Sequence, residues 1–133
     1  MSKTKTGANA QFTSAGKGLT VIGSHCYAFS GMTDVDNTET DLLLFQSPKQ
    51  YIEGKLNITN SGNLSFEEDF YFKVYFNGII VYAVLLEQAK VLNTSPYIPL
   101  LIPPLTEVKI TADNVSDSDI RSMSCQIIGK VYG

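Results

Sequence analysis

His25 and Cys26 are the neighbouring residues whose chemistry could support nucleophilic catalysis, with a thiolate as nucleophile and an imidazole as base. The surrounding stretch LTVIGSHCYAFS (19–30) reads as a strand region, and successive side chains of a strand point to opposite faces of the sheet. This geometry argues against a catalytic pair, so we expect His25, the chain's one histidine, to have a structural role.

The two cysteines, Cys26 and Cys125, lie near opposite ends of the chain. Together with one histidine they give too few ligands for a zinc site. We expect two buried thiols packed in strands, because free cysteine is often buried. A disulfide remains the alternative, since the first and last strands of a sandwich can be neighbours.

The loop GMTDVDNTETD (31–41) carries alternating acids, a pattern that can bind Ca²⁺: Asp34, Asp36, Glu39 and Asp41. An EF-hand loop counted from Asp34 would need glycine where Glu39 stands, and no helices flank the loop. We therefore expect a solvated acidic loop. The run Glu67-Glu68-Asp69 reads as an acidic turn, because adjacent carboxylates say nothing about the spacing that a glycosidase needs.

The sequence contains no Gly-Lys-Ser/Thr phosphate loop, no G-x-G-x-x-G and no G-x-S-x-G. It therefore predicts a protein that is not an enzyme, with no catalytic residues, no cofactor and no metal site.

Length and composition point to one domain. The chain has 133 residues, with 10 basic and 13 acidic side chains and a net charge of −3, so a nucleic acid is not the expected partner. No run of about 18 apolar residues is present, and the start MSKTKTGANAQF lacks the apolar core of a secretory signal. Residues 1–18 are small, polar and basic, and we expect an extended arm before a single domain at 19–133.

Strand and turn signals fill the rest of the chain. The expected strands are 19–30 with a bulge or kink at Gly23, 42–46, 50–62, the hairpin 69–88, an edge strand or crossing in the proline-rich 90–104, 105–112, and 122–133. Between them, 31–41 and 113–119 read as loops, with one helical turn allowed at 116–121. About seven or eight strands predict an all-β, antiparallel β-sandwich of jelly-roll or related Greek-key topology. An immunoglobulin-type sandwich is the rival, although its typical buried tryptophan is missing.

The stretch DFYFKVYFNGIIVYAVLLEQ (69–88) reads as a β-hairpin, since Asn77-Gly78 suits a two-residue type I′ turn. Such a turn sets the register. The core face would carry Phe70, Phe72, Val74 and Phe76, paired with Leu85, Ala83, Val81 and Ile79. The opposite face would carry Tyr71, Lys73, Tyr75, Ile80, Tyr82 and Val84, with Leu86 beyond them. Both faces would then be apolar, and one needs a cover.

Three alternatives could cover that second face: a segment of the same chain (1–18 or 96–104), a neighbouring copy, or a ligand such as a sugar stacking on the tyrosines. Ile80, Val84 and Leu86 favour a dry protein contact. We therefore expect a homo-oligomer, with its subunit interface formed by Tyr71, Lys73, Tyr75, Ile80, Tyr82 and Val84.

The second half of the chain resembles a known family. The proline-punctuated run PYIPLLIPPLTEVKITADNVSDSD and the final GKVYG resemble the capsid decoration, or cement, proteins of tailed bacteriophages, mainly over residues 95–133. That resemblance implies a small jelly-roll-like sandwich without catalytic residues, which sits as a trimer on the capsid surface of a virion after synthesis in the host cytoplasm. The partner would be the major capsid protein, with no nucleic acid and no membrane.

The basic arm suits capsid attachment, which we assign to Lys3, Lys5, Phe12 and Lys17. Its positive charge would favour an acidic shell surface, and an extended arm can add a strand to a neighbour's sheet edge. The alternative function is a carbohydrate- or receptor-binding module of a virion fibre or spike, with sugar on the tyrosines and specificity in loops 31–41 and 113–119.

Overall fold

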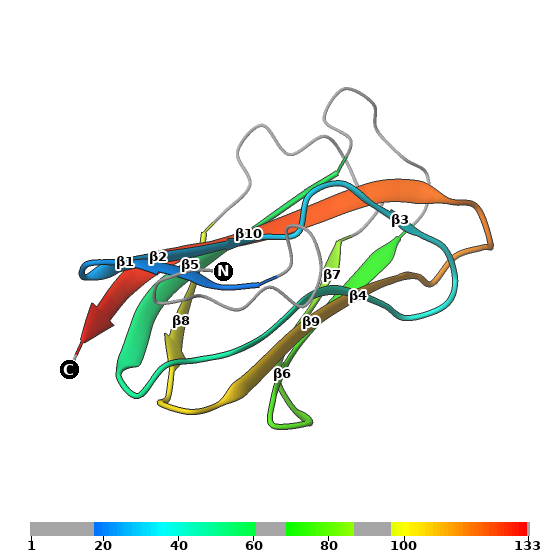
Figure 1. Ribbon diagram of the computed structural model, residues 1–133. Coiled ribbons are helices and arrows are strands. Elements are labelled where there is room, and N and C mark those ends of the chain that lie inside the picture. Colours follow the sequence, from blue (N-terminus) through cyan, green and yellow to red (C-terminus); the bar gives the residue numbers. More distant parts are fainter. Residues whose placement is uncertain (1–17, 61–68, 87–96, 133) are drawn as a thin grey trace.

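The fold is known from a computed structural model, which describes residues 18–60, 69–86 and 97–132. The described residues form ten strands: β1 (Thr20–Ile22), β2 (His25–Phe29), β3 (Thr33–Val35), β4 (Thr40–Gln46), β5 (Tyr51–Asn60), β6 (Phe70–Phe76), β7 (Ile79–Leu86), β8 (Ile98–Ile102), β9 (Glu107–Asn114) and β10 (Arg121–Tyr132). They build two antiparallel sheets packed face to face (Figure 1). The predicted antiparallel β-sandwich is confirmed. Within the described ranges, no helix could cross a membrane.

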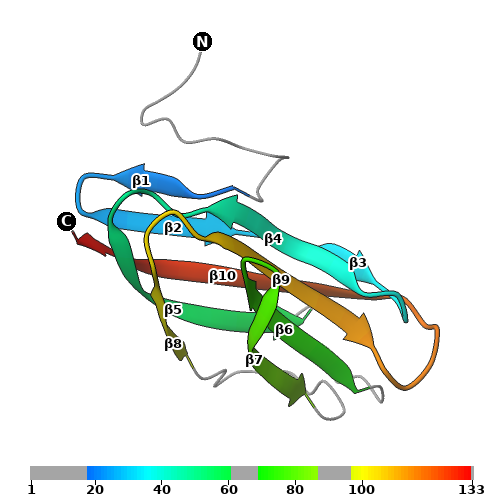
Figure 2. The same ribbon diagram turned by 90° about the horizontal axis from the view of Figure 1, so that it is seen from below.

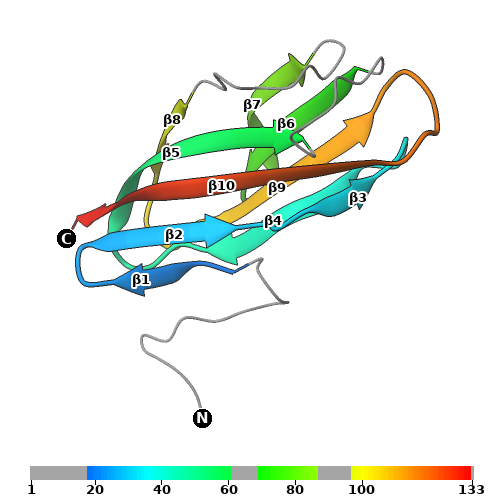
Figure 3. The same cartoon turned by 90° about the horizontal axis from the view of Figure 1, so that it is seen from above.

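The strand order is that of a jelly roll. The six-stranded sheet runs β1-β2-β10-β5-β8, with β3 also paired to β10, and the four-stranded sheet runs β4-β9-β6-β7. Figure 2 shows the four-stranded sheet from below, and Figure 3 shows β2, β10 and β5 side by side in the other sheet. From β3 onward, consecutive strands alternate between the sheets except for β6 and β7, which form a hairpin in the four-stranded sheet. Two interleaved Greek keys result.

The core lies between the sheets and follows the two-residue period of the strands. In β5, Ile52, Leu56 and Ile58 face inward, as their alternation predicted. The four-stranded sheet contributes Phe70, Phe72 and Val74 of β6, Val108, Ile110 and Ala112 of β9, and Leu42, Leu43 and Phe45 of β4. Burial of each large side chain contributes about 1.5–3 kcal/mol before entropy costs, which makes this layer the main stabilising element.

The structure has more strands than the sequence predicted, because two short pairings were missed. Gly23 is neither a bulge nor a kink inside one strand; with φ of +60° it lies in the turn that splits 19–30 into β1 and β2. The acidic segment 31–41 is not wholly a loop, since β3 pairs with β10. The edge strand expected in 90–104 is present as β8, and the last strand runs as β10.

The segment after β9 has no helical turn at 116–121. The buried side chain of Asn114 holds it instead. Its Oδ1 accepts hydrogen bonds from the N–H groups of Ser116 (2.9 Å) and Asp117 (3.1 Å), and its Nδ2 donates to Asp117 and to the carbonyl of Asp119. These local side-chain bonds replace those that a helix would have made.

Candidate functional site

The β6–β7 hairpin turns at Asn77-Gly78 as predicted. Both residues have positive φ, 52° and 81°, as a type I′ turn requires. Asn77 also ties the turn to β9, because its N–H donates to the carbonyl of Glu107 (2.8 Å) and its Oδ1 accepts from the N–H of Glu107 (2.9 Å). The hairpin is therefore anchored at its tip.

The register of the hairpin departs from the prediction after two pairs. Phe76 pairs with Ile79 and Tyr75 with Ile80, but Val74 then pairs with Tyr82. Val81 is the extra residue of a β-bulge, which the turn sequence alone does not reveal. Every pair beyond the bulge is shifted by one residue.

This shift moves two of the predicted interface residues to the other face. Tyr82 lies opposite buried Val74, and Val84 lies opposite buried Phe72 and packs against the core. Their assignment to the outer face was wrong. Ala83, paired with Lys73, and Leu85, paired with Tyr71, take their places there.

The outer face of the four-stranded sheet is a polar network around Glu39, rather than the apolar surface that was predicted. The hydroxyl groups of Tyr75 and Thr111 each donate a 2.6 Å hydrogen bond to Oε2 of Glu39. The ammonium of Lys73 lies 3.9 Å from Oε1. Glu39 thus extends from the segment between β3 and β4 onto strands β6 and β9.

Lysines cover two of the tyrosine rings on this face. Lys73 Nζ lies 5.2 Å from the centroid of the Tyr71 ring, and Lys109 Nζ lies 4.8 Å from that of Tyr75. Such cation–π contacts occupy the ring faces that a stacking sugar would need. The described part of 96–104 does not cover the face either, since β8 pairs with β5 in the other sheet.

The surroundings on this face shift the pKa values of three side chains. The hydrogen bonds from Thr111 and Tyr75 lower the pKa of the Glu39 carboxyl, and the hydrogen bond to Glu39 raises the pKa of Tyr75 to about 12. Burial raises the pKa of Asp113, although Lys73 opposes that change. These hydrogen bonds therefore keep Glu39 charged and Tyr75 neutral near neutral pH.

The apolar surface of the hairpin lies along the edge strand β7. Ile79, Ile80 and Val81 are 68%, 50% and 48% exposed, and Tyr82 and Leu85 are exposed as well. In the described part of the chain β7 pairs with β6 alone and ends the sheet. The strand IIVYAVLL contains no charge and no proline. It lacks the charges and prolines that often protect a sheet edge from pairing, and the bulge at Val81 is its one protective feature among the described residues.

A second cluster, which the sequence analysis missed, covers the outer face of the six-stranded sheet. The rings of Tyr27 and Phe29 lie 4.9 Å apart, and those of Tyr51 and Tyr132 stack at 5.1 Å with an interplanar angle of 9°. In the sequence, the alternation of Tyr27 and Phe29 with the small residues Cys26 and Ala28 was the signal that could have revealed these outward rings. His25 is exposed on this face.

The remaining candidates do not assemble a reactive site. Cys26 and Cys125 are buried thiols that are not joined in a disulfide, so the disulfide alternative is wrong, and burial raises the pKa of Cys26 to about 11. Asp36 accepts a hydrogen bond from the N–H of Thr38, and Asp34 accepts one from Ser122. Among the described residues no group of three or more His, Cys, Asp or Glu could hold a metal ion.

Several predicted residues lie outside the described ranges. They are the capsid-attachment set Lys3, Lys5, Phe12 and Lys17, and the acidic pair Glu67 and Glu68.

Comparisons with known proteins give matches of structure alone. No protein-family model matches the chain, and no curated protein matches it. A structure of the D431N mutant VP2 protein of infectious bursal disease virus in derived T=1 particles aligns with 93% of this chain, at 14% identity and a TM-score of 0.47. A VP2 subviral particle of that virus aligns with 93% of this chain at 13% identity and a TM-score of 0.48. The chain spans 36% and 37% of those two VP2 chains.

Proposed function

We propose that this chain is a non-enzymatic structural protein of a virion, a capsid decoration or cement protein that oligomerises and binds the assembled shell. The observation that carries the proposal is the exposed, uncharged edge strand β7. The jelly roll, an architecture that recurs in capsid and lectin domains, agrees with it at the level of fold analogy.

Strand addition explains how the edge would be used. A strand from a neighbouring subunit can pair with the outward N–H and C=O groups of β7, and main-chain hydrogen bonds then supply affinity. The same contact would cover Ile80, Val81 and Leu85, each of which is about half exposed in the single chain. Pairing of β7 with β7 of a second copy gives a two-fold dimer, whereas pairing with a different edge can close a ring. The resemblance over residues 95–133 favours a trimer.

The outward residues of β6 have a different role in the proposed interface from the one that the sequence predicted. Tyr71, Lys73 and Tyr75 are held by Glu39 and the lysines, so they form a rigid, charged border beside the edge. Ile80 remains an interface residue. Tyr82 joins it as an exposed residue of the edge strand itself, and Val84 is better assigned to the core. The lysine-covered rings argue against sugar binding at these tyrosines.

The protein would act by shifting the assembly equilibrium of the shell. A protein that binds only the assembled shell stabilises that shell by mass action. The major capsid protein would be the partner, and the arm residues Lys3, Lys5, Phe12 and Lys17 would provide attachment.

The experiment compares the full chain with a variant that lacks residues 1–18, each mixed with assembled shells and pelleted. We expect saturable binding of the full chain and reduced occupancy for the truncated one. Equal occupancy would contradict the role of the arm. If the full chain stays in the supernatant, and mass spectrometry of purified virions does not find it, the proposed function is wrong.

A further inference from the structure

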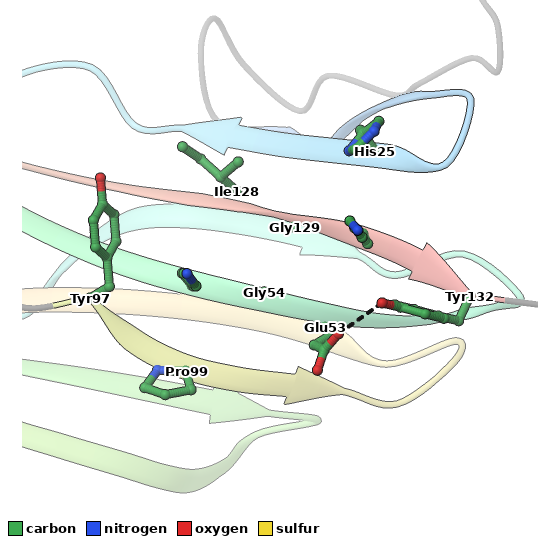
Figure 4. Close-up of a pocket in the computed structure, with 10 residues that line it drawn as sticks. His25, Glu53, Gly54, Tyr97, Pro99, Ile128, Gly129 and Tyr132 are labelled. Atoms are coloured by element: carbon green, nitrogen blue, oxygen red, sulfur yellow. Dashed lines mark hydrogen bonds between the residues drawn. The ribbon is translucent and has the colours of Figure 1, made fainter.

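We propose that a hollow on the outer face of the six-stranded sheet binds a saccharide, which goes beyond the structural role proposed above. The hollow measures about 630 Å³ and lies over strands β10 and β5, with Tyr132 at one end and Tyr97 at the other (Figure 4). Its size falls within the range of small-molecule sites, about 300–1,000 Å³.

The strand register places the outward side chains of the hollow in two rows across the sheet. One row across the sheet places Lys130 between His25 and Glu53. The row two residues away places Lys55 between Ile128 and Pro99. These outward side chains belong to paired positions, so they lie on one face.

The floor is backbone. Gly54 and Gly129 are directly paired between the two rows, and they approach so closely that a Cβ on Gly129 would lie 2.7 Å from Cα of Gly54. Their inward positions leave no side chain between the rows, so the hollow extends down to the sheet. The peptide groups of this floor pair with neighbouring strands, so the side chains around it supply the polar contacts.

The ends of the hollow are aromatic and fixed. Tyr132 stacks on Tyr51, and its hydroxyl donates a 2.9 Å hydrogen bond to Oε1 of Glu53. That bond raises the pKa of the Tyr132 phenol and orients the Glu53 carboxylate. At the other end, Lys55 Nζ lies 5.9 Å from the centroid of the Tyr97 ring. Tyr132 and Glu53 are therefore held in place before a ligand binds.

The chemistry of the lining fits a neutral polyol with apolar C–H faces. Glu53 supplies acceptor oxygens, while Lys55 and Lys130 supply donors, and sugar hydroxyl groups both donate and accept. The ring of Tyr132 and the side chain of Ile128 suit the C–H faces of a pyranose, while the ring of Tyr97, which Lys55 contacts, closes the other end. An anion would meet the Glu53 carboxylate, and a hydrocarbon would remove water from the charged groups of Glu53, Lys55 and Lys130 without replacing its hydrogen bonds.

The test is a titration of the full chain, followed by amide NMR, with glucose, galactose, N-acetylglucosamine and lactose, each added to tens of millimolar. We expect at least one sugar to shift the amides of Gly54, Gly129 and Lys130. Glu53→Ala should weaken that binding about tenfold, the equivalent of one charge-assisted hydrogen bond. Phe29→Ser, an exposed change on the same face outside the hollow, should leave the affinity unchanged.

The proposal is overturned if no sugar moves these amides, or if Glu53→Ala binds as tightly as the unaltered chain. It is also overturned if inorganic phosphate moves them and the sugars do not, since the hollow would then be an anion site. Sugar binding and subunit association are measured separately. A monomer that binds sugar would contradict the assembly role and support this site.

Discussion

The hydroxyl of Tyr75 donates a 2.6 Å hydrogen bond to Oε2 of Glu39, a residue 36 positions earlier in the chain. The same oxygen accepts from Thr111, so one carboxylate joins the segment before β4 to both β6 and β9. Through this contact the acidic loop is part of the outer surface of the four-stranded sheet. It also supports the hairpin whose other strand is the exposed edge.

Glu39→Gln should destabilise the protein at neutral pH, because the neutral amide keeps the shape but accepts weaker hydrogen bonds. We expect the free energy of unfolding to fall by about 1 kcal/mol, a value kept small by partial exposure of the carboxylate. Denaturant titration at pH 7 measures the change. The matched control is Glu107→Gln, an exposed acid on β9. Equal stability of Glu39→Gln and the unaltered chain would contradict the role of the network.

The stabilisation by Glu39 should disappear in acid. Its pKa is lowered in the folded protein from an ordinary value of 4.5, so the unfolded chain takes up a proton first as the pH falls. The contribution is fully present above pH 4.5 and is lost as the pH falls through the lower, folded value. Asp113, whose pKa is raised, acts in the opposite direction. The difference in unfolding free energy between the unaltered chain and Glu39→Gln isolates Glu39 and should shrink toward zero at low pH; a constant difference would rule out this linkage.

Gly129→Ala should be among the most damaging single-methyl changes in the sheet. The added Cβ would lie 2.6 Å from the carbonyl oxygen of Glu53 and 2.7 Å from Cα of Gly54, and backbone atoms cannot move aside without separating β10 from β5. We expect a loss of about 3 kcal/mol in unfolding free energy.

Gly54→Ala is the matched comparison for Gly129→Ala, because it adds the same methyl to the paired residue. Its nearest neighbour is the Cγ2 of Ile127 at 3.2 Å, a side-chain atom that can shift. We expect a loss of about 1 kcal/mol. Thermal or denaturant unfolding of both variants tests the difference, and a Gly54→Ala loss as large as that of Gly129→Ala would show that the backbone approach is not the cause.

The thiols of Cys26 and Cys125 should resist modification in the folded protein. Both are buried, and the pKa of Cys26 is raised to about 11, so little thiolate forms at pH 8. A colorimetric thiol reagent should react slowly with the native chain. After unfolding, it should react rapidly with both cysteines. Rapid native reaction at both positions would contradict the described packing.

Alternation and turn chemistry were enough to predict much of this fold. The two-residue period of Ile52, Gly54 and Leu56 placed β5 correctly, and Asn77-Gly78 placed the hairpin turn. The β-bulge at Val81 was not predictable, because its position depends on how β7 packs over the core rather than on the turn. That single extra residue reversed the faces assigned to Tyr82 and Val84.

The candidate sites were harder to predict than the fold. The hydrogen bond between Tyr75 and Glu39 joins residues 36 positions apart, and no local sequence pattern encodes it. The hollow likewise depends on the pairing of β5 with β10, which brings together the middle and the end of the chain. The uncharged run in β7 was visible in the sequence, but its place at the end of a sheet depends on the strand order.

Sedimentation velocity of the full chain at micromolar concentration tests the assembly role most directly. The variant is Val81→Lys, which puts a charge on the exposed edge at a residue without a strand partner in the described sheet. The control is Ile120→Lys, an apolar residue outside the strands that is 62% exposed, against 48% for Val81. We predict an oligomer for the unaltered chain and for Ile120→Lys, and a folded monomer for Val81→Lys. An unaltered chain that sediments as a monomer, or an oligomer that Val81→Lys leaves intact, would contradict assembly through β7.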